Sequence, residues 1–177
     1  MPADVAEKES PDKIAARGLK GVVAADSMIC DVDGDLGKLI YRGYNIDDLA
    51  VHSTFEEVAY LLFKGELPTA AELAAFRGQL AEHRAIEPEL MAFLKGMPKD
   101  TPPMTALRSA VSVSAHYDEL AEDCSLEANY RKSIRMTAEM VSLVAAIRRL
   151  RAGLEPIEPL PELSHAANFM YMLNGKV

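Results

Sequence analysis

The chain has 177 residues, a length that fits one domain or a large piece of a bigger one. Its 27 acidic and 19 basic side chains give a formal net charge of −8, which disfavours nucleic acids and anionic membranes as partners, because their phosphates attract basic protein surfaces. Apolar residues make up 49% of the sequence but aromatic residues only 6%, so the core must be built mainly from aliphatic side chains and some of the nine Met residues.

The N-terminal residues are polar and contain no apolar segment of the kind that a secretory signal requires. Residues 1–12 have the composition of a disordered tail, and we expect residues 13–177 to fold. No apolar run approaches the ~18 residues that a membrane span needs. Cys30 and Cys124 are isolated thiols without CxxC spacing, as is typical of a reduced protein. We therefore expect a cytoplasmic location.

The first expected element is a β-hairpin. Residues 22–29 and 38–41 are rich in β-branched and apolar side chains, and the segment between them is dense in turn formers. Gly34 and Gly37 can adopt positive φ there, and Gly43 is expected to end the second strand. The acidic turn, DVDGD, also invites a calcium-binding hypothesis. An EF-hand loop needs Gly at its sixth position and Glu at its twelfth, where this sequence has Leu36 and Arg42, so a plain turn is favoured.

Helical signals follow the hairpin. Ser53 and Thr54 stand three residues before Glu56 and Glu57, the spacing of a capping box, and predict a helix from about residue 55 to Gly65. The same spacing at Thr69 and Glu72 predicts a second helix. The apolar residues of this second helix recur at helical spacing, namely Leu73, Phe76 and Leu80.

Two further helices are expected to begin at prolines. One covers residues 88–95, and the other opens at Pro102-Pro103 and runs through Ser114. Proline suits the first turn of a helix, where its missing N–H would have no intrahelical partner. The acidic segment Asp118–Asp123 is expected to form a loop.

The longest expected helix covers residues 126–152, with Ser125 as its N-cap and Gly153 closing it. Its apolar stripe is wide, which indicates burial on more than one side. The face that carries this stripe is lined by Met136, Met140, Val144, Ile147 and Arg151, and is widened by Ile134, Val141 and Leu143. A stiff proline-rich connector follows, and a last helix is expected over residues 164–174. The sequence contains no internal repeat, and the expected fold class is mainly α with a small N-terminal β-hairpin.

The histidines form no recognisable metal or catalytic motif. His52, His83, His116 and His165 lack the i, i+4 spacing of paired zinc ligands, and we predict no metal site. Ser164 precedes His165 directly, but neighbours on a helix do not face each other. Ser164 is therefore interpreted as an N-cap and His165 as a packed or hydrogen-bonding structural residue.

Basic residues near glycines and at a helix end offer two weaker candidates. The segment Gly18–Gly21 is too short for a phosphate loop, although Arg17 and Lys20 could contact an anion. Arg148, Arg149 and Arg151 complement the negative end of the long helix, and a solvated last turn is favoured over an anion site. The residues alone therefore predict no catalytic constellation.

Four segments resemble the citrate synthase family and occur in family order over about residues 15–177. They are GLKGVVAADSMICDVDGDLGKLIYRGYNIDDLA, STFEEVAYLLFKGELPT, PMTALRSAVS and RAGLEPIEPLPELSHAANFMYMLNG. In this order, the first segment resembles the family's opening strand with its D-G-x-x-G turn and Y-R-G-Y run, and the second resembles a helix followed by the G-x-L-P break. The third resembles the proline–methionine helix start, and the fourth resembles the proline linker and the S-H-A-x-N-F segment. The resemblance implies citrate synthase-like large-domain helices preceded by the hairpin.

The resemblance also implies an activity. Such enzymes condense acetyl-CoA with oxaloacetate, using an aspartate base, two histidines and arginines that hold carboxylates. The H-A-D/E-H and G-P-x-H-G-G segments that carry those histidines follow the S-H-A-x-N-F segment, and this chain ends before either. We therefore assign no catalytic residue and expect the chain alone to be inactive, acting as the N-terminal portion of the enzyme. Only Arg17 matches a family arginine, and its guanidinium would contact a coenzyme A phosphate.

Further expectations follow from the resemblance. Acetyl-CoA would be a co-substrate, with no permanently bound cofactor, and the partner would be a second copy or a complementing C-terminal half. Two alternatives remain open: a 2-methylcitrate synthase using propionyl-CoA, and a non-catalytic helical interaction protein derived from the same scaffold. The chain has Pro102-Pro103-Met104 where the family usually has His-Pro-Met, so a proline replaces a histidine. This replacement favours the non-catalytic alternative weakly.

Overall fold

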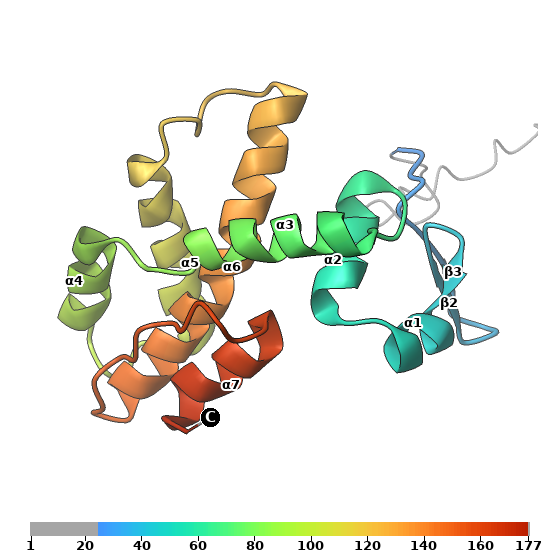
Figure 1. Ribbon diagram of the computed structural model, residues 1–177. Helices are drawn as coiled ribbons and strands as arrows, with labels where there is room; N and C mark the ends of the chain where they lie inside the picture. The colour runs from blue at the N-terminus through green and yellow to red at the C-terminus, as the bar shows by residue number, and fades with distance from the viewer. Residues whose placement is uncertain (1–24, 177) are drawn as a thin grey trace, which may run out of the picture.

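The computed structural model describes residues 25–176 and contains a small antiparallel sheet followed by helices α1 to α7 (Figure 1). The sheet and α1 lie at one end of the molecule, and helices α4 to α7 lie at the other, with α2 and α3 between them (Figure 1). The mainly α fold class with an N-terminal hairpin is confirmed. The predicted tail over residues 1–12 and the predicted contact residue Arg17 lie outside the described residues.

The sheet has the strand order β1-β2-β3, with β1 at Cys30–Asp33, β2 at Lys38–Tyr41 and β3 at Tyr44–Asn45. The predicted hairpin is confirmed, but its first strand lies later than residues 22–29. Asp33 explains this shift, since its Oδ1 accepts the N–H groups of Asp35 and Leu36 at 3.0 and 2.9 Å and so fixes the turn at residues 34–37. Only the second of the two turn glycines, Gly37, adopts positive φ, at 64°.

The third strand and the first helix were not predicted. Arg42 and Gly43 both have positive φ, at 48° and 91°, which makes a two-residue turn and pairs Tyr41 with Tyr44. The second strand thus ends just before Gly43, as predicted, and the chain turns there into β3. Helix α1 (Ile46–His52) follows directly, with the Asn45 side chain accepting the N–H of Asp47 at its N-terminus.

Helices α2 (Phe55–Lys64) and α3 (Ala70–Glu82) begin as their capping boxes predict. Thr54 and Glu57 exchange the reciprocal side-chain to backbone bonds of the box, and Thr69 and Glu72 do the same. Gly65 closes α2 in the left-handed conformation, at φ 93°. Both helices therefore owe their start to local sequence.

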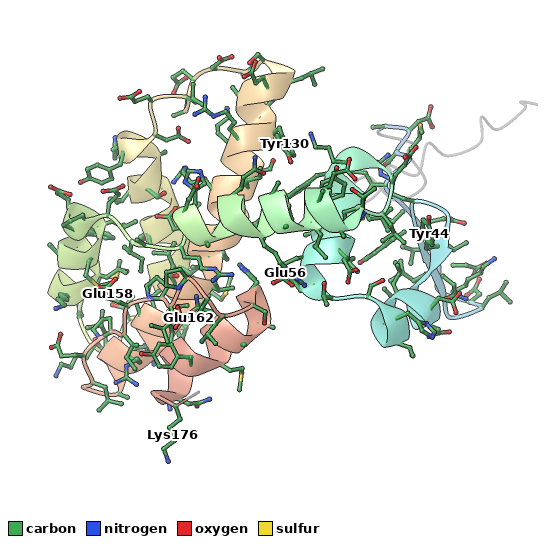
Figure 2. The ribbon with its side chains drawn as sticks, in the orientation of Figure 1. Tyr44, Glu56, Tyr130, Glu158, Glu162 and Lys176 are labelled. Atoms are coloured by element: carbon green, nitrogen blue, oxygen red, sulfur yellow. The ribbon has the colours of Figure 1, made fainter. Side chains whose placement is uncertain are left out.

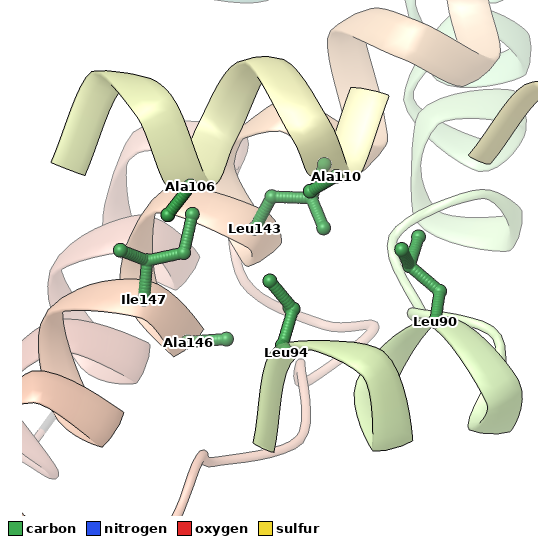
Figure 3. Packing of buried hydrophobic residues seen from close by; sticks show 7 residues of the cluster. All are labelled: Leu90, Leu94, Ala106, Ala110, Leu143, Ala146 and Ile147. Carbon is green, nitrogen blue, oxygen red and sulfur yellow. The ribbon is translucent and has the colours of Figure 1, made fainter. Parts of the chain in front are cut away.

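A first apolar core lies where α4 (Pro88–Gly96), α5 (Pro103–Ser114) and the C-terminal half of α6 (Leu126–Arg151) meet (Figure 3). Ala106 and Ala110 of α5 face Leu143 and Ile147 of α6, with Leu94 of α4 beside them (Figure 3). The buried members are Leu90, Leu94, Ala106, Ala110, Leu143, Ala146 and Ile147. The alanines let the helices approach closely enough for these leucines to be fully covered.

A second apolar core joins α2 and α3 to the N-terminal half of α6. Its buried members are Ala59, Phe76, Leu80, Ile134 and Ala138. Burial of α6 on more than one side is thus confirmed. The predicted methionine face is not the most buried one, because Met136 is 41% exposed while alanines of α6 are covered by other helices. The smaller side chains lie where helices cross, since they allow close approach.

The last helix, α7 (His165–Asn174), packs against α6 after an irregular proline-containing connector. A short 3₁₀ turn, η1 (Ala115–Tyr117), and the predicted acidic loop lie between α5 and α6. None of the helices in the described range is both long and apolar enough to cross a membrane.

Candidate functional site

The site is centred on His165, the first residue of α7. Its side chain is buried, with 2% of the residue exposed, and its ring stacks on Phe55 with centroids 4.6 Å apart and an interplanar angle of 7°. Ser164 caps the helix by accepting the N–H of Ala167, as predicted, and so makes no nucleophile–base pair with His165. The prediction of a packed histidine is confirmed, but both of its ring nitrogens are buried without a hydrogen-bond partner in the described part of the chain.

Glu56, which is labelled in Figure 2, joins this helix start to α2. Its Oε1 accepts the backbone N–H of His165 at 2.8 Å, a bond between residues 109 positions apart. The carboxylate is buried, and Arg77 Nε lies 4.0 Å from the same oxygen. Since Phe55 and Glu56 are consecutive, the first turn of α2 contacts both the ring and the backbone of His165.

Arg84 and Asn168 fix the connector that leads into α7. Arg84 is 2% exposed, and its Nη1 donates to the carbonyls of Leu160 and Leu163 at 3.3 and 2.8 Å. Asn168 accepts the N–H of Leu160 and donates to its carbonyl, at 3.2 and 3.0 Å. These bonds satisfy backbone groups of an irregular segment and thereby set where α7 begins.

The local electrostatics favour a neutral imidazole. Burial lowers the pKa of His165 below its ordinary value, the positive charge of Arg84 lowers it further, and the carboxylate of Glu56 partly offsets both. Burial also lowers the pKa of Arg84. A neutral imidazole has one donor and one acceptor nitrogen, so His165 can hydrogen-bond a keto or carboxyl oxygen.

A cavity of about 330 Å³ opens beside these residues. It is lined by Glu56, Arg77, Gly78, Ala81, Arg84 and residues 161–164. The Nε atom of Arg84 is buried without a partner among the described residues. Buried polar groups are nearly always paired, so the unpaired nitrogens of Arg84 and His165 set this region apart from an ordinary helix junction.

The other sequence-based candidates lie elsewhere or serve the backbone. Arg17, Lys20 and the Gly18–Gly21 segment precede the described residues. At the end of α6, Arg149 donates to the carbonyl of Glu155 at 2.6 Å, and Arg151 donates to the carbonyl of Thr101. These two arginines therefore hold loops in place, which differs from the solvated turn that was expected. In the described range, no three His, Cys, Asp or Glu side chains converge as metal ligands would.

A second cavity, of about 430 Å³, lies on an apolar face formed by α5, α6 and α7. Its lining includes Met104, Leu107, Val144, Phe169 and Leu173, and Met104 is 73% exposed. Two arginines, Arg148 and Arg151, border the apolar residues. Such a face is suited to cover by another protein surface and not to chemistry.

Sequence reasoning missed Glu56 and Arg84 as site residues. Glu56 stood inside a capping-box pattern in which its neighbour Glu57 makes the cap, so no local signal separated the two roles. Arg84 follows α3 in a turn and shows only as an arginine near a helix end. A long-range contact decides both roles.

Comparison with known proteins gives a consistent result. Residues 18–177 match a family model described as the C-terminal domain of citrate synthase. Citrate synthase from Haloferax volcanii is 47% identical over 90% of this chain and 43% of its own length. A 2-methylcitrate synthase from Mycobacterium tuberculosis is 39% identical over 96% of this chain and 42% of its own length. The chain thus spans about two fifths of the length of these relatives.

Solved structures agree in fold. The crystal structure of citrate synthase from Pyrobaculum aerophilum matches with a TM-score of 0.84 and 36% identity, over 90% of this chain and 42% of that one. A citrate synthase from Thermoplasma acidophilum, solved as a ternary complex with carboxymethyl coenzyme A and oxaloacetate, matches with a TM-score of 0.84 and 23% identity, over 90% of this chain and 42% of that one. The second match shows a common fold.

Proposed function

Because this chain belongs to the citrate synthase family, we propose that it forms the N-terminal part of an enzyme that condenses acetyl-CoA with oxaloacetate to citrate. The observation that carries this proposal is the match to a citrate synthase, 47% identical over 90% of the chain. The family model is described as a C-terminal domain, whereas the order of motifs, with the hairpin first, favours the N-terminal part of the enzyme. Locating the matching segments within the full-length sequence distinguishes an N-terminal from a C-terminal position.

His165 is the residue of this chain that we propose to contact oxaloacetate. It is a neutral, buried imidazole with unpaired nitrogens at the start of a helix, where the helix dipole favours an anionic group. Because both nitrogens are buried, a ligand reaches them only after a local movement, and the stacked Phe55 ring, which is 48% exposed, is the neighbour able to make it. The aspartate base and the two further histidines would come from residues outside this sequence.

The remaining roles follow from the same family assignment. Arg17 would contact a phosphate of coenzyme A, since a guanidinium matches phosphate geometry. Acetyl-CoA would act as a co-substrate without a permanently bound cofactor. The apolar face of α5, α6 and α7 would be covered in a cytoplasmic homodimer or by the C-terminal half of the enzyme. The exposed and unpaired Cys30 and Cys124 fit a reducing compartment.

A second candidate function is the synthesis of 2-methylcitrate from propionyl-CoA. It is favoured by the relative from Mycobacterium tuberculosis, which is 39% identical over 96% of this chain. The two functions differ by one methylene in the acyl group, and we propose that the residues selecting it lie outside this sequence.

The test is an assay of thiol release from acetyl-CoA and from propionyl-CoA, with and without oxaloacetate, by the full-length protein. We expect oxaloacetate-dependent release, and the ratio of kcat/KM for the two thioesters separates the two functions. If oxaloacetate-dependent thiol release is absent with both thioesters, the non-catalytic alternative is favoured. The 177-residue chain assayed alone is the matched control and is expected to be inactive. Turnover by that chain would overturn the proposal that the general base lies elsewhere.

A further inference from the structure

Glu56 occupies an unusual place for a carboxylate. Burying a charged group is unfavourable unless hydrogen bonds or an ion pair compensate. Among the described residues, the cation nearest to its Oε1 is Arg77, whose Nε lies at the long distance of 4.0 Å, whereas the backbone nitrogen of His165 lies at 2.8 Å. The shortest contact of this buried carboxylate is therefore the first backbone donor of α7.

We propose that Glu56 is a positioning residue, whose carboxylate fixes the backbone of His165 so that the imidazole is presented to the keto acid in one orientation. This inference rests on the proposed function, in which His165 contacts oxaloacetate. Glu56 itself needs no contact with the substrate. Its role is exerted through His165 alone.

The geometry supports this role from two sides. The backbone of His165 is held by Glu56, and its ring is held by the neighbouring Phe55 in a nearly parallel stack. Two consecutive residues of α2 therefore restrict both the helix start and the ring plane. Ser164 already caps α7 through the N–H of Ala167, so the bond from Glu56 adds a second constraint at the residue that carries the imidazole.

Two charged groups act on His165 from the elements packed against it, Glu56 from α2 and Arg84 from the turn after α3. Arg77 of α3 and Glu162 of the connector line the adjoining cavity. Arg84 lowers the pKa of His165 and Glu56 raises it. Loss of the Glu56 charge should therefore lower the pKa of His165 further. If Glu56 acted only as a helix cap, no such change in pKa would be expected.

The experiment compares substitutions in the full-length enzyme. Glu56→Ala removes the acceptor, and Glu56→Gln keeps an acceptor oxygen without the charge. We expect Glu56→Ala to raise KM for oxaloacetate about ten- to a hundredfold, with KM for the acyl-CoA unchanged. We expect Glu56→Gln to restore most of this loss. Glu162→Gln, which alters an exposed carboxylate at the same cavity, is the matched control and is expected to behave as wild type.

The outcomes separate the two proposals. An unchanged KM for oxaloacetate in His165→Ala would overturn the proposed substrate contact, and the positioning role with it. A raised KM in His165→Ala together with an unchanged KM in Glu56→Ala would overturn the positioning role alone. If Glu56→Ala fails to fold, Glu56→Asp withdraws the acceptor by one methylene and provides the same comparison. Nitrogen-15 NMR of the His165 ring gives a readout independent of activity, with a lowered pKa expected in Glu56→Gln and an unaltered titration counting against the role.

Discussion

The hydroxyl of Ser114, at the end of α5, donates a hydrogen bond of 2.8 Å to Oε2 of Glu139 in the middle of α6. Both residues are buried, and Arg135 donates to the same hydroxyl and carboxylate at 2.7 and 2.9 Å. Arg135 also contacts Asp118 at 3.0 Å, beyond the end of α5. A single arginine therefore ties α5, the acidic loop and α6 together through charge-assisted bonds.

Removing Glu139 should destabilise the fold. Glu139→Ala leaves Ser114 and part of Arg135 without an acceptor, and we expect a loss of about 2–3 kcal/mol in the free energy of unfolding, measured by urea denaturation. The expected loss of unfolding free energy is smaller than for a fully buried ion pair, because Arg135 retains its ion pair with Asp118. The matched control is Glu155→Gln, which breaks the exposed Lys95–Glu155 pair and should leave stability unchanged within error. Equal effects of the two substitutions would contradict this account.

The stability of the chain should depend on the protonation of His165. The pKa of His165 is lowered from 6.5, so between its folded-state pKa and 6.5 the unfolded chain binds more protons than the folded one. Stability is therefore full above pH 6.5 and falls as the pH decreases below it. Urea denaturation across this range should show the decline, and His165→Gln should flatten it. The lowered pKa of Glu57 acts in a separate window, below 4.5. An identical pH dependence in wild type and variant would contradict the assignment.

The two capping boxes allow a matched comparison. Thr54→Ala and Thr69→Ala each remove one N-cap, and each should lower the unfolding free energy by about 1 kcal/mol. Only Thr54 precedes the turn that carries Phe55 and Glu56, so only Thr54→Ala should alter the NMR signals of the His165 ring. Changed ring signals in Thr69→Ala would argue against a specific link between α2 and His165.

Two glycines should respond to alanine in opposite directions. Gly65 ends α2 at φ 93°, where an L side chain is strained, so Gly65→Ala should destabilise the chain by about 1 kcal/mol or more. Gly78 lies inside α3 with open space at the Cβ position, so Gly78→Ala should stabilise it by about 0.5–1 kcal/mol. Thermal unfolding monitored by circular dichroism measures both. A stabilised Gly65→Ala would show that the helix end can rearrange.

Elements with local signals were predictable from the sequence, and those decided by longer-range pairing were not. Thr54 and Thr69 predicted the starts of α2 and α3, because a capping box is complete within four residues. Strand β3 was missed because its turn places the non-glycine Arg42 at positive φ. Arg42 Nη2 donates to the carbonyl of Leu62 at 3.1 Å, a tertiary contact that helps to hold the backbone of Arg42 in this conformation.

The candidate site was less accessible to sequence reasoning. His165 was recognised as a packed residue, but its unpaired nitrogens depend on what surrounds it. Glu56 lies 109 residues away, and Arg84 acts on the connector across the fold. No spacing rule brings such residues together. Family resemblance identified the segments without assigning these contacts.

Helix α6 contributes Ile134 to one apolar core and Leu143 to the other. At 26 residues it is about 39 Å long, so the two cores are separated along one continuous rod. If either core melts, the helix loses packing on part of its length, and helices gain most of their stability from packing. The two cores should therefore unfold in a single cooperative transition, and damage to one should be detectable as faster amide exchange in the other.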